Sequence, residues 1–335
     1  MVRFGIVGFG LHAVKRVMPG FALAKDSRVT ALSRRELSKA HESARQFNIP
    51  LAFDSVEALC SSPEVDAVFV CSPNSLHLRD TMQAIQCGKH VLCEKPMAMN
   101  ADEACQMVEA AKEANVLLGI AQVFRFEDST ARLRDRIAEG QIGKPVFARS
   151  EFSFPGSREH ARKWLKDPAI AGGGAIGDVG VHCIDALRYI LQDEIMRVST
   201  SGITDGSNGV DLAAIMTLGF TRGTLGTVLV SYIPEYRTPM EFTGDGGNLF
   251  ANDGLTVDRP VQIELRRGGK IVESETVSNH LAYARQVDAF SAAVEEKAKF
   301  PVLGEEGWQN QTILDAAFRS LRNGKSEMVF KVTTH

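Results

Sequence analysis

The chain has 335 residues, 44% of them hydrophobic, and its 38 basic and 41 acidic side chains leave a formal charge of -3. This length supplies two domains with cores of their own, and the balanced charge gives no sign of a nucleic-acid partner or a membrane surface. The N-terminus leads straight into an apolar run, so we expect no signal peptide. No apolar stretch approaches the ~20 residues of a membrane span. We therefore expect a soluble, enzyme-sized protein.

The first third of the chain alternates short apolar runs with helical patterns. Strands are predicted at residues 3–9, 29–33, 66–72, 89–93 and 116–121. Helices are predicted between them at residues 12–24, 35–47, 75–87 and 101–115, and Asn100 followed by Glu103 resembles a capping box at the start of the last. Strands that are apolar along their whole length suit a parallel sheet covered on both faces. These βα units predict a doubly wound α/β domain over residues 1–121.

The rest of the chain has a different pattern. Strands are predicted at residues 146–154, 196–203, 211–220, 223–233, 239–242 and 261–266, with short turns between most of them. Turns that short join antiparallel neighbours. Helices are predicted at residues 129–140, 177–191, 280–297 and 305–323. We expect a second, α+β domain over residues 122–335, with one broad, mainly antiparallel open sheet.

The six cysteines lie mostly in apolar segments and form no C-x-x-C pair. A zinc site or a redox dithiol would need such pairs. We predict buried free thiols in a reducing cytoplasm and no metal site.

A glycine-rich turn joins the first predicted strand to the first predicted helix. Gly8 permits the tight turn of a dinucleotide-binding loop, Gly10 lets the backbone approach a pyrophosphate, and Ala13 stands where a small residue is allowed. The helix N-terminus that follows attracts the phosphate charge. A purely structural turn is the alternative. The predicted cofactor-binding residues of this turn are Gly8, Phe9, Gly10, Leu11 and His12.

The end of the second predicted strand lacks the carboxylate that would bind a ribose 2′-hydroxyl. Ser33, Arg34 and Arg35 stand there instead. Hydroxyl and guanidinium groups suit a 2′-phosphate, because arginine offers paired donors to a dianion that an aspartate would repel. NADP is therefore favoured over NAD as the cofactor. The alternative is an arginine pair that is merely solvated at the start of a helix.

The tripeptide Glu94-Lys95-Pro96 follows the apolar run 90–93. Proline has a fixed φ and no N–H, so it constrains the turn around it. A lysine just past a buried strand is poorly placed for solubility and well placed to project an ammonium into a cleft. We interpret Lys95 as a proton donor beside a bound cofactor.

A polar stripe runs along the helix predicted at 177–191. Asp178, His182 and Asp185 are spaced i, i+4, i+7, which places them on one side of that helix. A lone histidine is more often structural than catalytic. Here a carboxylate lies four residues away and a glycine run, 172–174, precedes the helix, so His182 with Asp178 is predicted to be catalytic. We interpret Asp185 as a supporting or structural residue.

Four segments together carry a family resemblance. They are Gly8-Phe9-Gly10, Cys71-Ser72-Pro73-Asn74 with His77, residues 88–96 (GKHVLCEKP) and residues 177–185 (GDVGVHCID). With them the chain resembles, over essentially its whole length, the glucose-fructose oxidoreductase and inositol dehydrogenase (Gfo/Idh/MocA) family. The glycine turn is unspecific, whereas the last two blocks combined are highly specific. The resemblance implies a Rossmann domain, then an α/β domain whose open sheet packs against a partner subunit, and a sugar, polyol or cyclic diol as substrate.

The resemblance also implies roles for single residues. Lys95 matches the family lysine that contacts substrate and serves in proton transfer, and Pro96 matches the proline that directs it. His182 and Asp178 match the second catalytic group and the polar residue one helical turn before it. Glu94 matches the carboxylate next to the nicotinamide ribose. The residues implied to line the cofactor are Cys71, Ser72, Pro73, Asn74 and His77.

The chain departs from the family at one position. Many members have arginine after a tryptophan that precedes the glycine run, whereas Trp164 is followed here by Leu165. The nearby basic residues that could replace that arginine are Arg158, Arg162, Lys163 and Lys166. Trp164 is a candidate substrate residue or a packing aromatic. Arg125 is a second candidate, which lines the cleft or pairs with a carboxylate.

Together these features predict an NADP-dependent oxidoreductase that transfers hydride between nicotinamide C4 and a secondary alcohol or carbonyl of a carbohydrate-like substrate. Lys95, assisted by His182 and Asp178, would move the hydroxyl proton. Two other classes stay open: a glycoside hydrolase that uses bound NAD as a transient redox catalyst, and a non-catalytic NAD(P)-binding regulator. The sequence does not name the sugar or the direction of reaction.

The predicted second sheet has more strands than the helices around it can cover on both faces. The runs 213–218 and 224–231 carry apolar or threonine residues on both alternations, which is unlike a solvated outer face. We expect a homodimer or tetramer that forms through this sheet.

Overall fold

The computed structural model describes residues 1–156, 164–206 and 209–332. Within them the chain forms two compact units. Among these residues, the first unit comprises Met1–Gln122 together with Tyr283–Gln311, and the second comprises Val123–Ala282 together with residues 312–332. Each is described by itself.

The first unit is built on a six-stranded parallel sheet in the order β3-β2-β1-β4-β5-β6. The strands are β1 (Val2–Val7), β2 (Ser27–Ser33), β3 (Leu51–Phe53), β4 (Ala67–Val70), β5 (His90–Cys93) and β6 (Leu118–Ile120). All four residues of β4 are buried, as expected for a central strand with helices on both faces. This is the predicted doubly wound Rossmann arrangement.

Helical segments connect these strands. They are η1 (Ala13–Val17), α1 (Met18–Leu23), α2 (Leu37–Phe47), α3 (Val56–Cys60), η2 (Asn74–Leu76), α4 (His77–Gln86) and α5 (Ala101–Glu113), followed by α9 (Ala282–Val294) and the first part of α10 (Gly304–Asn323). The predicted cap of α5 is confirmed, because Asn100 Oδ1 accepts a hydrogen bond of 2.9 Å from Glu103 N.

The order of strands reverses between β1 and β4, which lie side by side at the centre of the sheet. The strand after β1 in the chain, β2, lies on one side of this pair, and the strand after β4, β5, lies on the other side. In open α/β sheets such a switch point is where ligands bind. The turns after β1, β4 and β5 contain most of the residues predicted to bind a cofactor.

The second unit has a nine-stranded sheet in the order β14-β13-β12-β11-β7-β10-β9-β8-β15. Its strands are β7 (Pro145–Ser153), β8 (Ile195–Thr204), β9 (Asp211–Phe220), β10 (Leu225–Ser231), β11 (Met240–Gly244), β12 (Asn248–Ala251), β13 (Val261–Arg267), β14 (Lys270–Val277) and β15 (Glu327–Met328). Neighbouring strands are antiparallel except β7 and β10, which run parallel. The predicted mainly antiparallel open sheet is thereby confirmed.

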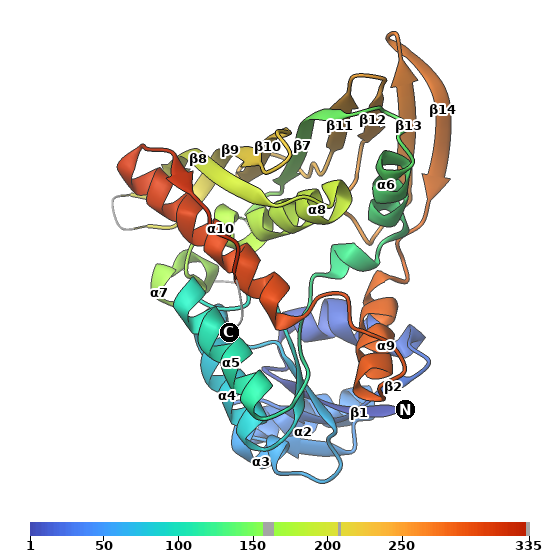
Figure 1. Ribbon diagram of the computed structural model, residues 1–335. Helices are drawn as coiled ribbons and strands as arrows, with labels where there is room; N and C mark the ends of the chain where they lie inside the picture. Colours follow the sequence, from blue (N-terminus) through green and yellow to red (C-terminus); the bar gives the residue numbers. More distant parts are fainter. Residues whose placement is uncertain (157–163, 207–208, 333–335) are drawn as a thin grey trace. The chain divides into compact units, whose positions relative to one another are not determined.

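One face of this sheet is covered by helices. They are α6 (Asp128–Ala138), α8 (Val181–Leu191) and the end of α10, which lie on the same side in Figure 1. Ser320 on α10 accepts a hydrogen bond from Thr200 N of β8, at 2.8 Å. Shorter helical segments are η3 (Val123–Phe126), α7 (Pro168–Ala171) and η6 (Ile176–Gly180).

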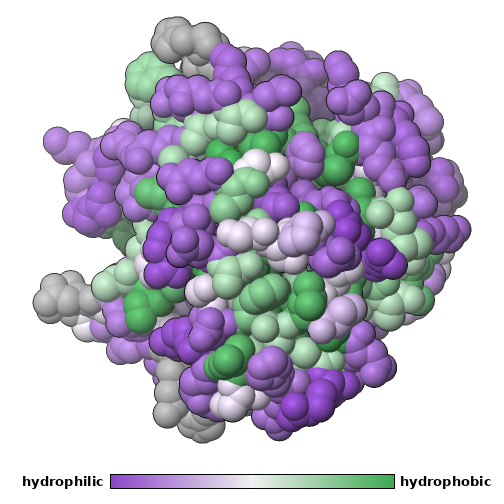
Figure 2. Space-filling view, turned by 90° about the horizontal axis from the view of Figure 1, so that it is seen from below, coloured by the Kyte–Doolittle hydropathy of each residue, from purple (hydrophilic) through white to green (hydrophobic). Residues whose placement is uncertain are grey.

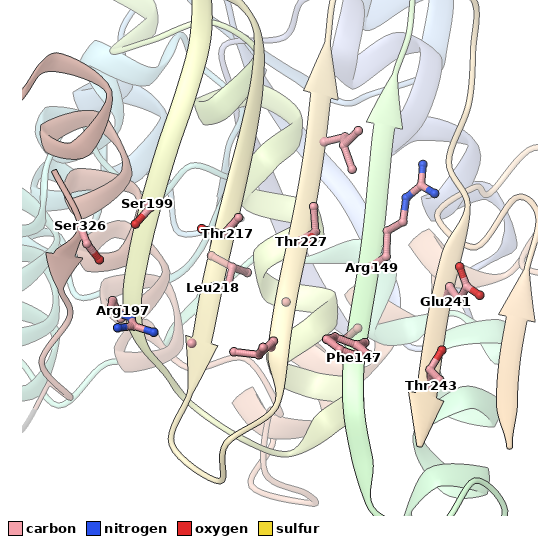
Figure 3. Close-up of a pocket in the computed structure, with 15 residues that line it drawn as sticks. Phe147, Arg149, Arg197, Ser199, Thr217, Leu218, Thr227, Glu241, Thr243 and Ser326 are labelled. Carbon is pink, nitrogen blue, oxygen red and sulfur yellow. The ribbon is translucent and has the colours of Figure 1, made fainter. Parts of the chain in front are cut away.

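The other face of the sheet carries a shallow cavity of about 800 Å³. Phe147 and Arg149 of β7, Thr217 of β9 and Thr227 of β10 project into it (Figure 3). Phe147 and Leu225 are 56% and 50% exposed, so this face presents large apolar side chains to its surroundings.

Seven elements were not predicted from the sequence: β3, α3, η3, α7, β12, β14 and β15. Three of them are strands of two to four residues, too short for periodicity to emerge. Strand β14 is longer, but its sequence KIVESETV is mostly exposed and lacks an apolar face that would mark it as a strand. Figure 2 shows one face of the molecule, on which hydrophilic and hydrophobic residues are interspersed.

Candidate active site

The glycine turn after β1 is packed directly against the loop after β4. Gly8 has φ +74°, a conformation that favours glycine. A Cβ on Gly8 would lie 2.6 Å from the backbone nitrogen of Ser72, so no side chain fits. Phe9 is buried against the ring of Phe47, with centroids 5.4 Å apart, and its N–H donates to Ser33 O at 3.1 Å. These contacts fix the turn to the loops after β2 and β4.

The residues that follow Phe9 in the turn are less buried. Gly10 is exposed, and a Cβ there would meet only the carbonyl oxygen of Gly8, at 3.6 Å. Leu11 and His12 are half-buried in the first helical turn, which continues as the π-helical segment η1. Such segments occur frequently at functional sites.

His12 and Glu94 connect the turns after β1 and β5. His12 Nε2 lies 2.8 Å from Glu94 Oε1, and the imidazole also packs edge-on against Tyr283 with centroids 6.4 Å apart. Burial raises the pKa of Glu94, but the charge and hydrogen bond of His12, and then Lys95, outweigh it and hold that pKa below its ordinary value. Glu94 is therefore a buried carboxylate in its ionised form.

Lys95 is half-buried immediately after Glu94, and its backbone N–H donates to Glu94 Oε2 at 3.2 Å. The Lys95–Pro96 peptide bond is cis, and Pro96 is buried. The turn after β5 thus gives Lys95 a defined backbone direction beside an ionised carboxylate.

His77 connects the loops after β4 and β5. It is 1% exposed, and its ring nitrogens lie 2.9 Å from Pro96 O and 2.8 Å from Ser72 O. Burial lowers the pKa of His77 more than these carbonyls raise it. The imidazole holds the loop after β4 against the turn after β5, which is a role the sequence did not indicate.

The loops after β1 and β4 are suited to a dinucleotide. Ser72 Oγ is buried and has no hydrogen-bond partner among the described residues, which leaves it available to a bound group. Pro73 is half-buried and Asn74 is buried beside it, while burial, Glu94 and Cys93 raise the pKa of Cys71 well above its ordinary value. An unpartnered hydroxyl, open Gly10 and a first helical turn at the switch point fit a pyrophosphate.

Of the two arginines predicted after β2, Arg34 is held by hydrogen bonds. Ser33 is buried, and Arg34 Nη1 donates to Ser43 Oγ of α2 at 2.8 Å. Arg34 N also donates to Phe53 O of β3, at 3.1 Å. Arg35 is exposed. The guanidinium of Arg34 is therefore held in a fixed place, and that of Arg35 is exposed to solvent.

In the second unit the predicted stripe lies on η6 and α8. His182 is 8% exposed and packs against two aromatic rings, Phe124 edge-on at 4.6 Å and Phe152 stacked at 6.1 Å. Asp178, one turn earlier, accepts a hydrogen bond of 3.1 Å from Tyr232 Oη. Tyr232 was not predicted, because it follows a strand and its sequence neighbours give no sign of a polar partner.

Arg125 pairs with the third residue of the stripe. Its Nε and Nη2 donate to the two carboxylate oxygens of Asp185, at 2.9 Å and 2.7 Å, in a bidentate arrangement. Both side chains are buried, 7% and 2% exposed. Arg125 also lies 5.5 Å from the ring centre of Tyr189. Of the two roles considered for Arg125, this geometry matches the carboxylate pair.

Trp164 is half-buried in a short helical turn, and its carbonyl accepts a hydrogen bond from Asp167 N at 3.1 Å. Lys166 is exposed. Arg158, Arg162 and Lys163 lie outside the described residues. In the described part of the chain, no three His, Cys, Asp or Glu side chains are grouped to hold a metal ion, and no helix there is long and apolar enough to cross a membrane.

Comparisons with known proteins agree with this geometry. A family model described as an oxidoreductase family with an NAD-binding Rossmann fold matches residues 2–122, and a Gfo/Idh/MocA C-terminal domain model matches residues 130–250. A 1,5-anhydro-D-fructose reductase of Ensifer adhaerens is 32% identical over 311 residues, 92% of each chain. A D-xylose 1-dehydrogenase (NADP(+)) of Haloferax volcanii is 33% identical over 328 residues, 96% of this chain and 98% of its own.

Among solved structures, an aldose-aldose oxidoreductase from Caulobacter crescentus in complex with glycerol has the same fold. The TM-score is 0.89 at 25% sequence identity, over 98% of this chain and 99% of that one.

Proposed function

We propose that this chain, which belongs to the Gfo/Idh/MocA family of oxidoreductases, is an NADP-dependent enzyme of that family that acts on a secondary alcohol or carbonyl of a sugar, polyol or cyclic diol. The observation that carries the proposal is the turn after β5. There Lys95 follows the ionised Glu94, which His12 ties to the glycine turn at 2.8 Å. A lysine in that place is positioned to hold or move the proton of a reacting hydroxyl.

The bound cofactor supplies the hydride acceptor or donor. Around it, Gly8 and Gly10 leave room for the pyrophosphate, Ser72 Oγ and Asn74 line its path, and Glu94 fits beside a ribose. Lys95 takes the proton from the substrate hydroxyl during oxidation or returns it during reduction. His182 and Asp178 assist that transfer by orienting the hydroxyl.

NADP is preferred over NAD in this proposal because the end of β2 carries basic rather than acidic groups. Arg34 is held by Ser43 at 2.8 Å, so its guanidinium loses little freedom when it binds a 2′-phosphate. The Haloferax relative is named as an NADP(+) enzyme, which also supports this preference.

The substrate class is supported by two observations. The relatives described above are named for sugars or anhydrosugars. In the second unit, His182 lies against the rings of Phe124 and Phe152, and aromatic rings of this kind offer an apolar surface to the C–H face of a sugar ring.

The proposal is tested by initial rates with purified protein, either NADP or NAD, and a panel of aldoses, anhydrosugars, inositols and cyclic diols. We expect formation of reduced nicotinamide with at least one sugar or polyol, at a higher kcat/KM for NADP. Glycoside cleavage without net change in free cofactor would instead favour a transient redox hydrolase. Tight cofactor binding with no turnover of any kind would favour a regulator.

We also propose that the chain assembles through its large sheet. The outer face presents Phe147, Ile215 and Leu225, which are 56%, 49% and 50% exposed, and Figure 3 shows Phe147 among threonines on that face. A homodimer or dimer of dimers that packs these faces about a two-fold axis would bury more than ~1,600 Å² in total. A monodisperse mass near 36.5 kDa in light scattering at low micromolar concentration would contradict it.

The cytoplasm is the proposed location. All six cysteines are free thiols in the structure, and free thiols persist in a reducing compartment.

A further inference from the structure

The start of the helix that carries Asp178 and His182 is anchored to the first residue of β9, an interior strand of the large sheet. Asp211, the first residue of β9, accepts hydrogen bonds from the backbone N–H groups of Gly174 and Ile176, each at 2.6 Å. A Cβ on Gly174 would lie 1.8 Å from Asp211 O, so the chain passes the strand in backbone contact. The backbone four residues before Asp178 is therefore fixed to β9, and Asp178 N donates to Gly174 O at 3.0 Å.

The adjacent strand holds the Asp178 side chain itself. Tyr232 directly follows β10, and its hydroxyl donates to Asp178 Oδ2 at 3.1 Å. Tyr232 is 5% exposed, and its ring packs edge-on against Phe154 with centroids 5.2 Å apart. Its backbone N–H donates to Leu212 O at 2.8 Å. The donor is therefore immobilised at both its backbone and its ring.

Because β9 and β10 are antiparallel neighbours, the two anchors lie close to each other. Ala213 pairs with Ser231 in the register, so Asp211 and Tyr232 lie at the same end of adjacent strands. Asp211 holds the backbone at the start of η6, and Tyr232 holds the carboxylate of Asp178 on η6. This arrangement joins three segments that are distant in sequence.

Acidic groups near Asp178 make the hydrogen bond that it accepts from the Tyr232 hydroxyl important for its charge. Burial raises the pKa of Asp211 to about 6, against the hydrogen bonds from Ile176 and Gly174, and the charge of Asp178 adds to the rise. Asp178 thus has a second acidic group nearby. On β7, which also packs against η6, the acidic Glu151 is paired with Arg149 and Arg237. A hydrogen bond donated to an ionised carboxylate stabilises the charged form.

We propose that Tyr232 is a positioning residue of the reaction: its hydroxyl fixes the rotamer and the charge of Asp178, on a helical turn that Asp211 attaches to the sheet. The inference rests on the proposed function for its kinetic consequence, and the hydrogen bond itself can be tested without turnover.

The test is Tyr232→Phe, with Tyr189→Phe as the matched control. The control removes another tyrosine hydroxyl from the same unit, one that is hydrogen-bonded to Arg134 and lies on α8. We expect Tyr232→Phe to lower kcat by about 10- to 100-fold, which corresponds to one hydrogen bond to a charged group, with little change in KM. The acid limb of its kcat profile should move to higher pH. Tyr189→Phe should leave kcat and its pH profile unchanged.

A double-mutant cycle separates positioning from general damage. If Tyr232 acts through Asp178, then Tyr232→Phe should have little further effect on kcat in an Asp178→Asn background. Equal losses in both backgrounds, or an unchanged kcat and pH profile in the single variant, would overturn the proposal.

A second readout does not need activity. Carboxyl NMR of protein labelled at aspartate should show the Asp178 titration midpoint at higher pH in Tyr232→Phe than in the parent protein, with the midpoint unchanged in Tyr189→Phe. An unchanged midpoint in both variants would overturn the role of the hydroxyl. If this shift is present but no substrate turns over, then the proposed function fails and the positioning contact stands.

Discussion

The two units hold their candidate residues in different ways. In the first unit, the candidate side chains lie on loops that leave neighbouring parallel strands, and these loops are connected by His77 and by the His12–Glu94 pair. In the second unit, Asp178 and His182 share one helix, which is fixed by strand ends that follow it in the sequence. The first arrangement makes cofactor binding depend on loop backbone, and the second makes side-chain orientation depend on the sheet.

On this comparison, Lys95→Ala should abolish proton transfer and leave the loops of the first unit in their parental conformation. We expect kcat to fall by roughly two to four decades, the range for a lost general acid or base, with the Kd for NADP nearly unchanged. Lys89→Ala is the control, because its ammonium lies at the other end of β5 and donates to Ser62 O and Val65 O. Near-parental kcat in Lys95→Ala, measured beside Lys89→Ala, would remove Lys95 from the mechanism.

The close packing of loop backbone in the first unit is tested by substituting two glycines, Gly8 and Gly88, that have similar φ. Gly8→Ala would place a Cβ 2.6 Å from Ser72 N, whereas at Gly88, φ +68°, a Cβ would meet no atom within 4 Å. Left-handed backbone alone costs about 1–2 kcal/mol for a non-glycine residue. Thermal unfolding should therefore show a modest loss for Gly88→Ala and a clearly larger one for Gly8→Ala, which should also lose cofactor affinity. Equal losses would argue against the close packing of the two loops.

Cofactor choice should depend on the arginine that the loop after β2 holds. Arg34→Ala should weaken NADP by one to two decades and leave NAD nearly unchanged, since charge-assisted contacts to phosphate are worth about 1.5–3 kcal/mol. Titration calorimetry with both cofactors measures these affinities. Arg45→Ala, in the last turn of α2, is the control. Equal weakening of both cofactors would assign Arg34 to the fold or to the shared pyrophosphate.

The smallest expected effect concerns a buried acid of the second unit. Glu127 is 1% exposed, and its Oε1 has no partner among the described residues. Burial, opposed by Ser129 and reinforced by Asp128, raises its pKa well above 4.5. A raised folded-state pKa gives stability that is present at low pH and lost as the pH rises. Relative to the parent, Glu127→Gln should thus gain unfolding free energy from about pH 4.5 upward.

Chemical denaturation between pH 4 and pH 8 measures that gain, with the exposed Glu139→Gln as control. A difference between parent and Glu127→Gln that does not vary with pH would show that folding does not raise the pKa of Glu127.

The sequence indicated the first unit more completely than the second for a physical reason. Gly8 and Arg34 directly follow a strand, and Lys95 is the second residue after one, so local pattern and the geometry of parallel sheets place them at the carboxyl ends of the strands. The stripe of Asp178, His182 and Asp185 was also local, because helical periodicity fixes it. Tyr232 and Asp211 could not be predicted, since their partners depend on which strand ends meet η6. The same holds for the pairing of Arg125 with Asp185, 60 residues apart.

Short or polar strands were missed for a related reason. Strand β14 is paired along its whole length with β13, but its side chains are mostly exposed, so its position follows from backbone hydrogen bonds rather than from an apolar pattern.

Transfer of deuterium from substrate to cofactor tests the central claim most directly. A substrate found in the panel would be deuterated at the carbon that bears the reacting hydroxyl, and free NADPH would be isolated and its nicotinamide C4 examined by NMR. We predict one deuterium at C4 for each substrate molecule oxidised, and loss of this labelled product in Lys95→Ala. Cleavage of a glycoside with the label retained in the sugar and no labelled free NADPH, or no transfer at all with cofactor bound, would contradict the account.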